Sequence, residues 1–258
     1  MSVIFEKIAH MIAASASKDI QLSAKKYGGH CTHPFCQGKG NIFKAIKGQK
    51  DTHGGVCHAL SSIWIYYHIK GDSLWNHLYI NYNPNILNQV VMDRVKMLQK
   101  FGIAASGDGM DQDRVTEDWF KSKGIAQKHF SLVGSEGYTR GKNKKRFFSG
   151  IHGRQIDKSE NSAKKTDPKT LAKAIARPYS GISDYKLVSV FGTLAAHTFA
   201  VYTGTNEILM FDPNFGEYWF STSFFENWFA NYFWHKAKYD VSFALGKAWE
   251  IRHYSPLC

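Results

Sequence analysis

The sequence predicts an α+β fold, with helices in the first half of the chain and an antiparallel sheet in the second half. Two observations lead to this prediction. Apolar residues recur at helical spacing between residues 57 and 102, and short β-rich runs follow one another after Pro178. Helices and strands do not alternate regularly, as they would in a doubly wound sheet. With 258 residues and 43% hydrophobic content, the chain is long enough to bury a sizeable core.

The first 40 residues differ in composition from the rest of the chain. They are rich in Ala, Ser, Lys and Gly, and their only apolar helical pattern is short. We therefore expect residues 1–40 to form an N-terminal arm, either flexible or an address for a specialised secretion machine, ahead of one large domain at 41–258. The start of the chain lacks the charged-then-apolar layout of a classical secretion signal.

Three helices are predicted before the sheet. The first begins at Cys57, because Leu60, Ile63, Trp64 and Tyr67 recur at i, i+3, i+4 and i+7. The second follows Pro84 and ends near Gly102, with a stripe of apolar residues: Leu87, Val90, Val91, Val95, Leu98 and Phe101. The third begins with Asp167 as its cap and Pro168 at its first position.

The second half of the chain predicts strands at 185–192, 197–204 and 206–212. A tight turn at residues 204–206 joins the last two as a hairpin. An aromatic helix follows, for which the spacing of Ser223 and Glu226 predicts a capping box. The composition of the segment 239–254 predicts further strand.

The net charge of +12 is unevenly distributed. Residues 140–173 carry eleven Lys or Arg against three Asp or Glu, which is two thirds of the excess. We interpret residues around 134–170 as a basic, solvated insertion. The alternative is a patch that meets an anionic membrane surface or an acidic partner. Nucleic acid is not expected as a partner, because the sequence has neither an RNA-binding aromatic pattern nor zinc-finger spacing.

The four cysteines, at positions 31, 36, 57 and 258, are too scattered for a disulfide framework and favour a reducing working compartment. Two of them lie with His30 and His33 in the run "HCTHPFC". Structural zinc sites usually need a second, separated Cys/His pair, and none follows at a usual distance. We therefore expect neither a metal nor an organic cofactor.

Three residues, Cys57, His197 and Asp212, predict a reactive thiol. Cys57 stands at the start of a predicted helix, where free N–H groups favour a thiolate, and Gly54 and Gly55 leave room beside its sulfur. Taken alone, Cys57 is better interpreted as a buried core residue. However, His197 begins one strand of the predicted hairpin and Asp212 ends the other, so the two become neighbours. We expect Asp212 to accept the Nδ1 proton of His197 and to stabilise its imidazolium.

The order Cys, His, Asp, with the cysteine on an N-terminal helix, is the papain-like layout. The runs "GGVCHALSSIW", "AAHTFAVY" and "FDPNFGEYWF" resemble three blocks of the YopT/AvrPphB group of bacterial effector cysteine proteases. The resemblance implies a papain-like catalytic domain with the triad Cys57, His197 and Asp212. It also implies a host protein as substrate. Delivery from a bacterium without a classical signal peptide, and activity in the host cytosol or at a membrane there, are implied as well.

Two points stay open at this stage. The papain layout places a Gln or Asn donor for the oxyanion shortly before the cysteine, and only Gln49 and Thr52 are candidates here. A deamidase or transglutaminase would use the same triad on a glutamine side chain, and a basic membrane-binding module would use no catalysis at all. The sequence leaves the identity of the substrate and the oligomeric state undetermined.

Overall fold

The computed structural model describes residues 3–47, 52, 55–107, 112–134, 138–139, 155–156, 167–179, 183–191, 196–240, 245 and 248–257. Within them, the centre of the molecule is a seven-stranded antiparallel sheet in the order β1-β8-β7-β6-β5-β9-β2. The strands are β1 (Gly29–Pro34), β2 (Ile125–Gly134), β5 (Asp184–Phe191), β6 (Ala196–Thr203), β7 (Glu207–Asp212), β8 (Gly216–Ser221) and β9 (Ala248–Pro256). A separate short pair joins β3 (Tyr138–Thr139) to β4 (Gln155–Ile156).

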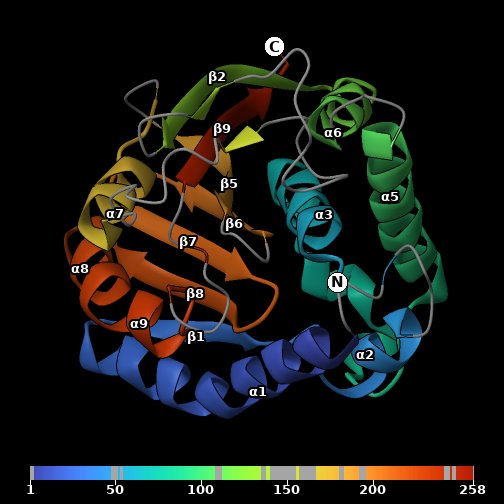
Figure 1. Ribbon diagram of the computed structural model, residues 1–258, viewed down its shortest axis with the longest axis horizontal. Coiled ribbons are helices and arrows are strands. Elements are labelled where there is room, and N and C mark those ends of the chain that lie inside the picture. Colours follow the sequence, from blue (N-terminus) through green and yellow to red (C-terminus); the bar gives the residue numbers. More distant parts are fainter. Residues whose placement is uncertain are drawn as a thin grey trace.

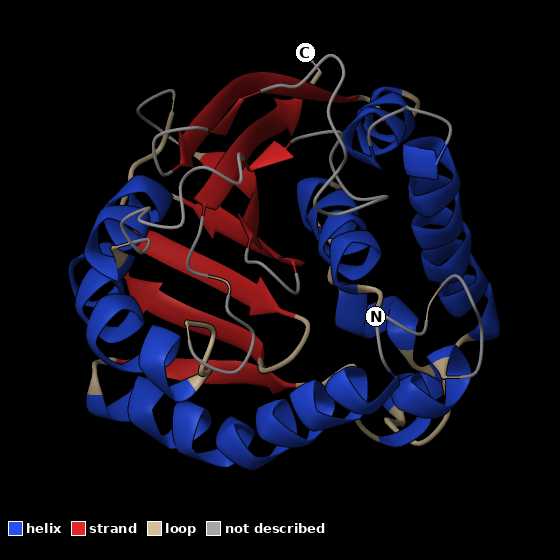
Figure 2. Ribbon diagram, viewed as in Figure 1, coloured by secondary structure: helices blue, strands red, loops and turns tan. Residues whose placement is uncertain are grey.

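Helices cover both faces of the twisted sheet (Figures 1 and 2). One face carries α2 (Gly40–Ile46), α3 (Cys57–Ile69), α4 (Leu74–Leu78), α5 (Gln89–Gly107) and α6 (Gln112–Lys121), with a 3-10 turn η1 (Ile80–Tyr82) between α4 and α5. The other face carries α1 (Val3–Lys26), α7 (Pro168–Ala176), α8 (Thr222–Trp228), the π-helical turn η3 (Phe229–Phe233) and α9 (Trp234–Lys236). The sheet therefore separates two apolar cores.

The alternation of β6 and β7 explains this division. Phe199 and Val201 point into the core shared with α1, α7 and α8, whereas Ala200 and Phe211 point into the core shared with α3. Successive side chains of a strand face opposite sides of a sheet, so each of these strands contributes to both cores. The strands consequently appear as continuous apolar runs in the sequence.

Two of the predicted helices are confirmed in detail. Helix α3 begins at Cys57, and α7 begins at Pro168 with Asp167 as its cap. The Asp167 carboxylate accepts hydrogen bonds from the backbone N–H groups of Lys169 and Thr170. The first turn of α7 is thus held as the sequence predicts.

Two local predictions are wrong. Helix α5 begins at Gln89, five residues after Pro84, and continues to Gly107, beyond the predicted end near Gly102. Leu87 therefore lies before the helix, and Val90 and Phe101 are 69% and 55% exposed, so these three residues do not belong to its buried stripe. The expected capping box of the aromatic helix is also absent, because Ser221 occupies the cap position of α8 and no side-chain hydrogen bond closes it. Both errors concern helix ends, where turns and tertiary contacts override spacing patterns.

The predicted strands at 185–192, 197–204 and 206–212 are confirmed as β5, β6 and β7. The run expected as strand at 239–254 overlaps β9, which extends from Ala248 to Pro256, whereas Tyr239 and Asp240 lie in a turn. Strands β1 and β2 were not predicted. The expected arm, residues 1–40, contains α1 and β1, and the buried residues Ala16, Ile20 and Ala24 of α1 pack into the core beside α7 and α8. Most of the predicted basic insertion at 134–170 lies outside the described residues.

The edge strand β1 reaches the sheet through a close approach at Gly216. This glycine begins β8 with φ +108°, and a Cβ atom there would lie 2.4 Å from the His33 carbonyl oxygen. Only glycine tolerates both the conformation and the contact. None of the described helices is long and apolar enough to cross a membrane.

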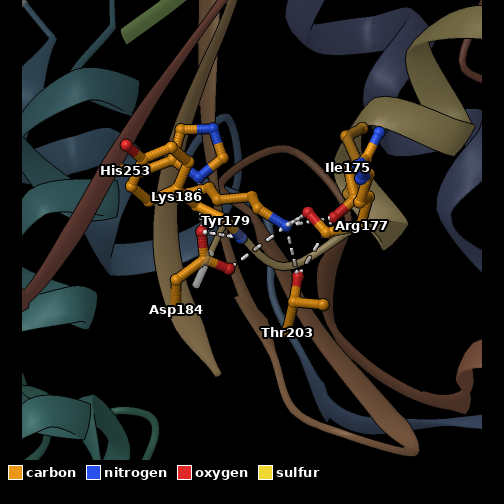
Figure 3. A network of polar contacts seen from close by, with 7 residues as sticks. All are labelled: Ile175, Arg177, Tyr179, Asp184, Lys186, Thr203 and His253. Atoms are coloured by element: carbon orange, nitrogen blue, oxygen red, sulfur yellow. Dashed lines mark hydrogen bonds and ion pairs between the residues drawn. The ribbon is translucent and has the colours of Figure 1, made fainter. Parts of the chain in front are cut away.

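A buried lysine attaches α7 to the sheet (Figure 3). Lys186 on β5 is fully buried, and its ammonium donates hydrogen bonds to the carbonyls of Ile175 and Arg177, at the C-terminal end of α7, and to Thr203 Oγ1. Asp184 Oδ1 lies 3.3 Å from the ammonium. Burial lowers the pKa of Lys186 to about 8, although Asp184 acts in the opposite direction. The cation therefore satisfies carbonyls that the helix end leaves open.

Candidate active site

Cys57 occupies the first position of α3 and is partly exposed. The residue before it, Val56, occupies the cap position with φ −125° and ψ 28°, outside the helical region, and Gly55 has φ +105°. A helix start leaves several N–H groups unpaired, and they favour negative charge on a sulfur at that point. The local sequence thus places a thiol where a thiolate is stabilised. Gly54 lies outside the described residues.

His197 and Asp212 come together at the open end of the β6–β7 hairpin. The ladder of paired residues between these strands runs from Thr203 opposite Ile208, beside the turn, to Ala200 opposite Phe211. His197 and Asp212 lie beyond this last pair, at the end away from the turn. His197 Nε2 lies 3.1 Å from Asp212 Oδ1, and both side chains are buried. We expected Asp212 to contact Nδ1 of His197, but it contacts Nε2 instead. Nδ1 is therefore the ring nitrogen left to interact with Cys57.

Two further groups hold the Asp212 carboxylate. Its Oδ1 accepts the backbone N–H of Asn214 at 2.8 Å, and its Oδ2 accepts the hydroxyl of Tyr239 at 2.7 Å. Tyr239 is fully buried, and its ring lies 5.2 Å from that of His197. A carboxylate with this many donors is fixed in orientation.

The pKa values of Cys57 and His197 shift in opposite directions. Burial works against a thiolate at Cys57, but the hydrogen bond with His197 and its positive charge outweigh burial and lower the pKa below the usual 9.0. Burial likewise works against an imidazolium at His197, but the charge and hydrogen bond of Asp212, together with Cys57, raise its pKa to about 10. The arrangement therefore favours a thiolate–imidazolium pair at neutral pH.

The other two described cysteines have the opposite character. Burial, with the nearby charge of Glu217, raises the pKa of Cys31 to about 11, and burial also raises that of Cys36. Both thiols stay protonated at neutral pH, whereas the Cys57 thiol is set up to ionise. Among the described residues, no group of three or more His, Cys, Asp or Glu side chains could hold a metal ion.

Of the two expected oxyanion donors, Gln49 lies outside the described residues. Thr52 is buried, and its hydroxyl donates to the carbonyl of Ile46 at 2.8 Å. Because a hydroxyl has a single proton, Thr52 has none left for an oxyanion in this arrangement.

Two polar residues at the site were not found from the sequence. Tyr239 falls in a segment that was interpreted as strand, and Gln37 lies well before Cys57, inside the region expected to be an arm. The amide of Gln37 contacts both the backbone before Cys57 and the turn after Asp212. Only a signal that links distant segments could have identified either residue, and a single sequence contains none.

Comparisons with known proteins find relatives along almost the whole chain. The model of the family Peptidase C58, described as Yersinia/Haemophilus virulence surface antigen, matches residues 21–255. The chain is 30% identical to the cysteine protease YopT of Yersinia enterocolitica over 256 residues, which cover 97% of this chain and 72% of that protein. It is also 27% identical, over 85% of its length, to 5% of the Histophilus somni protein adenylyltransferase and cysteine protease IbpA.

The fold has a relative of known structure. The crystal structure of the Pseudomonas avirulence protein AvrPphB matches with a TM-score of 0.50 and 15% identity, covering 80% of this chain and 95% of that one. At this identity the likeness concerns the fold alone. It confirms the predicted papain-like α+β architecture.

Proposed function

This chain belongs to the Peptidase C58 family and is a cysteine protease, and we propose that Cys57, His197 and Asp212 carry its reaction as nucleophile, general acid–base and orienting carboxylate. The observation that carries the assignment is the buried His197–Asp212 pair, 3.1 Å apart, together with Cys57 at the first position of α3, and the opposed pKa shifts of Cys57 and His197 agree with it. The thiol at the start of α3 is acidified by a histidine that is itself made more basic by a buried aspartate. Elsewhere in the described chain, the thiols of Cys31 and Cys36 have raised pKa values.

The proposed chemistry follows from these protonation states. The Cys57 thiolate attacks the carbonyl carbon of a peptide bond, and a tetrahedral oxyanion forms. It collapses to a thioester as the C–N bond breaks, and the His197 imidazolium gives its proton to the departing amine. His197, now neutral, takes a proton from water, whose oxygen attacks the thioester and releases the acid product. Asp212 holds the imidazole in place throughout.

Backbone N–H groups at the start of α3 support the oxyanion in this proposal. The N–H of a first helical residue such as Cys57 lies outside the helix ladder, and it is close to the reacting carbon once the sulfur is bonded to that carbon. Gln49 stays the candidate for a second donor. The hydroxyl of Thr52, engaged by the Ile46 carbonyl, is the weaker one.

The substrate in this proposal is a protein of a host cell. The relatives support this class of function, because two of them bear the name cysteine protease and the family is described as a virulence antigen. We propose that the chain is a secreted effector that works in the host cytosol. The excess of positive charge across residues 140–173 would favour an anionic membrane surface there.

Thiol reactivity tests the assignment. The full chain is treated with iodoacetamide at mildly acidic pH, and modification at each cysteine is followed by mass spectrometry, for the wild type and for His197→Ala. We expect selective labelling of Cys57 that disappears with His197. Labelling of Cys57 no faster than of Cys31 and Cys36 would contradict the assignment.

A second experiment separates proteolysis from attack on glutamine side chains. A host-cell lysate is incubated with the wild type or with Cys57→Ser, and new protein N-termini are compared with glutamine-to-glutamate conversions. New N-termini that require Cys57 support proteolysis. Conversions without new N-termini would identify a deamidase instead.

A further inference from the structure

Gln37 connects the two halves of the molecule beside the proposed triad. It lies between β1 and α2 and is only 3% exposed. Its Oε1 accepts the backbone N–H of Val56 at 2.9 Å, and its Nε2 donates to Asn214 Oδ1 at 2.9 Å. Its own backbone N–H donates to the carbonyl of Pro213 at 2.7 Å. The residue thus contacts the segment before Cys57 and the turn after Asp212 at the same time.

These contacts close a circuit through the proposed triad. From Gln37 the connection passes to Asn214, whose N–H donates to Asp212 Oδ1 at 2.8 Å. Asp212 contacts His197 at 3.1 Å, and His197 in turn is the main group that lowers the pKa of Cys57. Cys57 follows Val56 in the chain, and the backbone N–H of Val56 donates to Gln37, which closes the circuit. Every member of this circuit except Cys57 is buried.

A glutamine fits this position for a chemical reason. The buried N–H of Val56 needs an acceptor, and the buried side-chain oxygen of Asn214 needs a donor. The primary amide of a glutamine supplies both. The backbone before Val56 is restricted as well, since Gly55 has φ +105°, a conformation that residues with a side chain rarely adopt. A buried N–H or carbonyl without a partner is costly, so loss of the amide forces at least one of the two segments to shift.

We propose that Gln37 is a positioning residue for the reaction: its amide sets the placement of the start of α3 relative to the Asp212 turn, and with it the contact between Cys57 and His197. Gln37 does not itself touch the reacting atoms in this scheme. The inference rests on the proposed function, because it assigns Gln37 to the same triad. It adds a residue from the N-terminal segment, which the triad alone leaves without a role.

The test measures the pH dependence of Cys57 alkylation by iodoacetamide in the full chain. In Gln37→Met both hydrogen bonds are lost with little change in size, and in Gln37→Glu the acceptor for Val56 is kept but the donor to Asn214 is lost once the carboxyl ionises. A looser Cys57–His197 contact leaves burial as the dominant influence on the thiol, so the inflection of the profile moves to higher pH. We expect the rate at about pH 6.5 to fall by about three- to tenfold, since each unit of pKa removes about tenfold of thiolate and the more basic thiolate regains part of the loss.

Gln99→Ala is the matched control. Gln99 is also a buried glutamine, 8% exposed, but it lies on α5. We expect Gln99→Ala to change the thermal unfolding midpoint without moving the alkylation profile, whereas the Gln37 variants move the profile. This comparison separates a positioning role from a general loss of stability.

The outcomes distinguish the two proposals. Selective labelling in the wild type combined with wild-type profiles in both folded Gln37 variants would overturn the role of Gln37 and leave the triad intact. Labelling of wild-type Cys57 no faster than Cys31 would overturn the triad and, with it, the positioning role. If Gln37→Met does not fold, Gln37→Glu decides the question.

Discussion

Asp212→Asn tests the electrostatic basis of the site most directly. The substitution keeps the shape of the side chain and removes its charge. Asp212 is the main group that raises the pKa of His197 to about 10 against the effect of burial. Without it, burial is opposed only by Cys57, so we expect the pKa of His197 to fall from about 10 toward its usual 6.5. A fall of that size corresponds to about 5 kcal/mol of lost preference for the imidazolium, as an order of magnitude.

The consequence appears at the thiol. With His197 neutral, the interactions that lower the pKa of Cys57 are weakened, so we expect that pKa to rise toward the usual 9.0, although the lost Asp212 charge, which raises it, acts in the opposite direction. At about pH 6.5 a thiol of that pKa is about 300-fold less ionised than a preformed thiolate. A more basic thiolate is a better nucleophile, so we expect the alkylation rate to fall by roughly ten- to thirtyfold.

The assay is the rate of iodoacetamide modification at Cys57 between about pH 5 and pH 10, with unfolding by urea measured in parallel. Asp184→Asn is the control, because Asp184 is another buried aspartate that contacts a histidine, His253, at the opposite end of β5 from the residue paired with His197. We expect Asp184→Asn to lose stability and keep the wild-type profile. A wild-type profile in Asp212→Asn would refute the ion-pair reasoning.

Two further predictions concern stability. Lys186→Met leaves the Ile175 and Arg177 carbonyls and the Asp184 charge without their cation, so we expect the free energy of unfolding to fall by about 3–5 kcal/mol in urea titrations; an unchanged midpoint would contradict the network. Burial opposes ionisation of Glu217, but hydrogen bonds from His33, Thr32, Trp64 and Trp75 outweigh it and lower its pKa below 4.5. The ionised Glu217 therefore contributes its full stabilisation above pH 4.5, and this is lost as pH falls through the lower folded-state pKa. We expect the free energy of unfolding of Glu217→Gln to depend less on pH in this acidic range than that of the wild type.

Elements with strong local signals were predictable from the sequence. The start of α3, the cap of α7 and the β6–β7 hairpin each depend on residues close together in the chain, such as Asp167 beside Pro168. The hairpin also brought His197 next to Asp212 by simple geometry, since two antiparallel strands joined by a tight turn share their outer ends. Strand β1 had no such signal, because its pairing with β8 joins residues as distant as His33 and Glu217, 184 positions apart.

The sequence by itself determined which residues are chemically suited to a thiol mechanism: a cysteine at a helix start, and a histidine and an aspartate at one hairpin end. The tertiary structure decided whether the cysteine and the histidine are ionised. Whether Cys57 ionises depends on the balance between burial and the His197 charge, and whether His197 stays protonated depends chiefly on Asp212, whose carboxylate is held by Tyr239 and Asn214. Burial and electrostatic coupling act through space, and residues such as Gln37 and Tyr239 enter the site only when the folded chain brings its distant segments together.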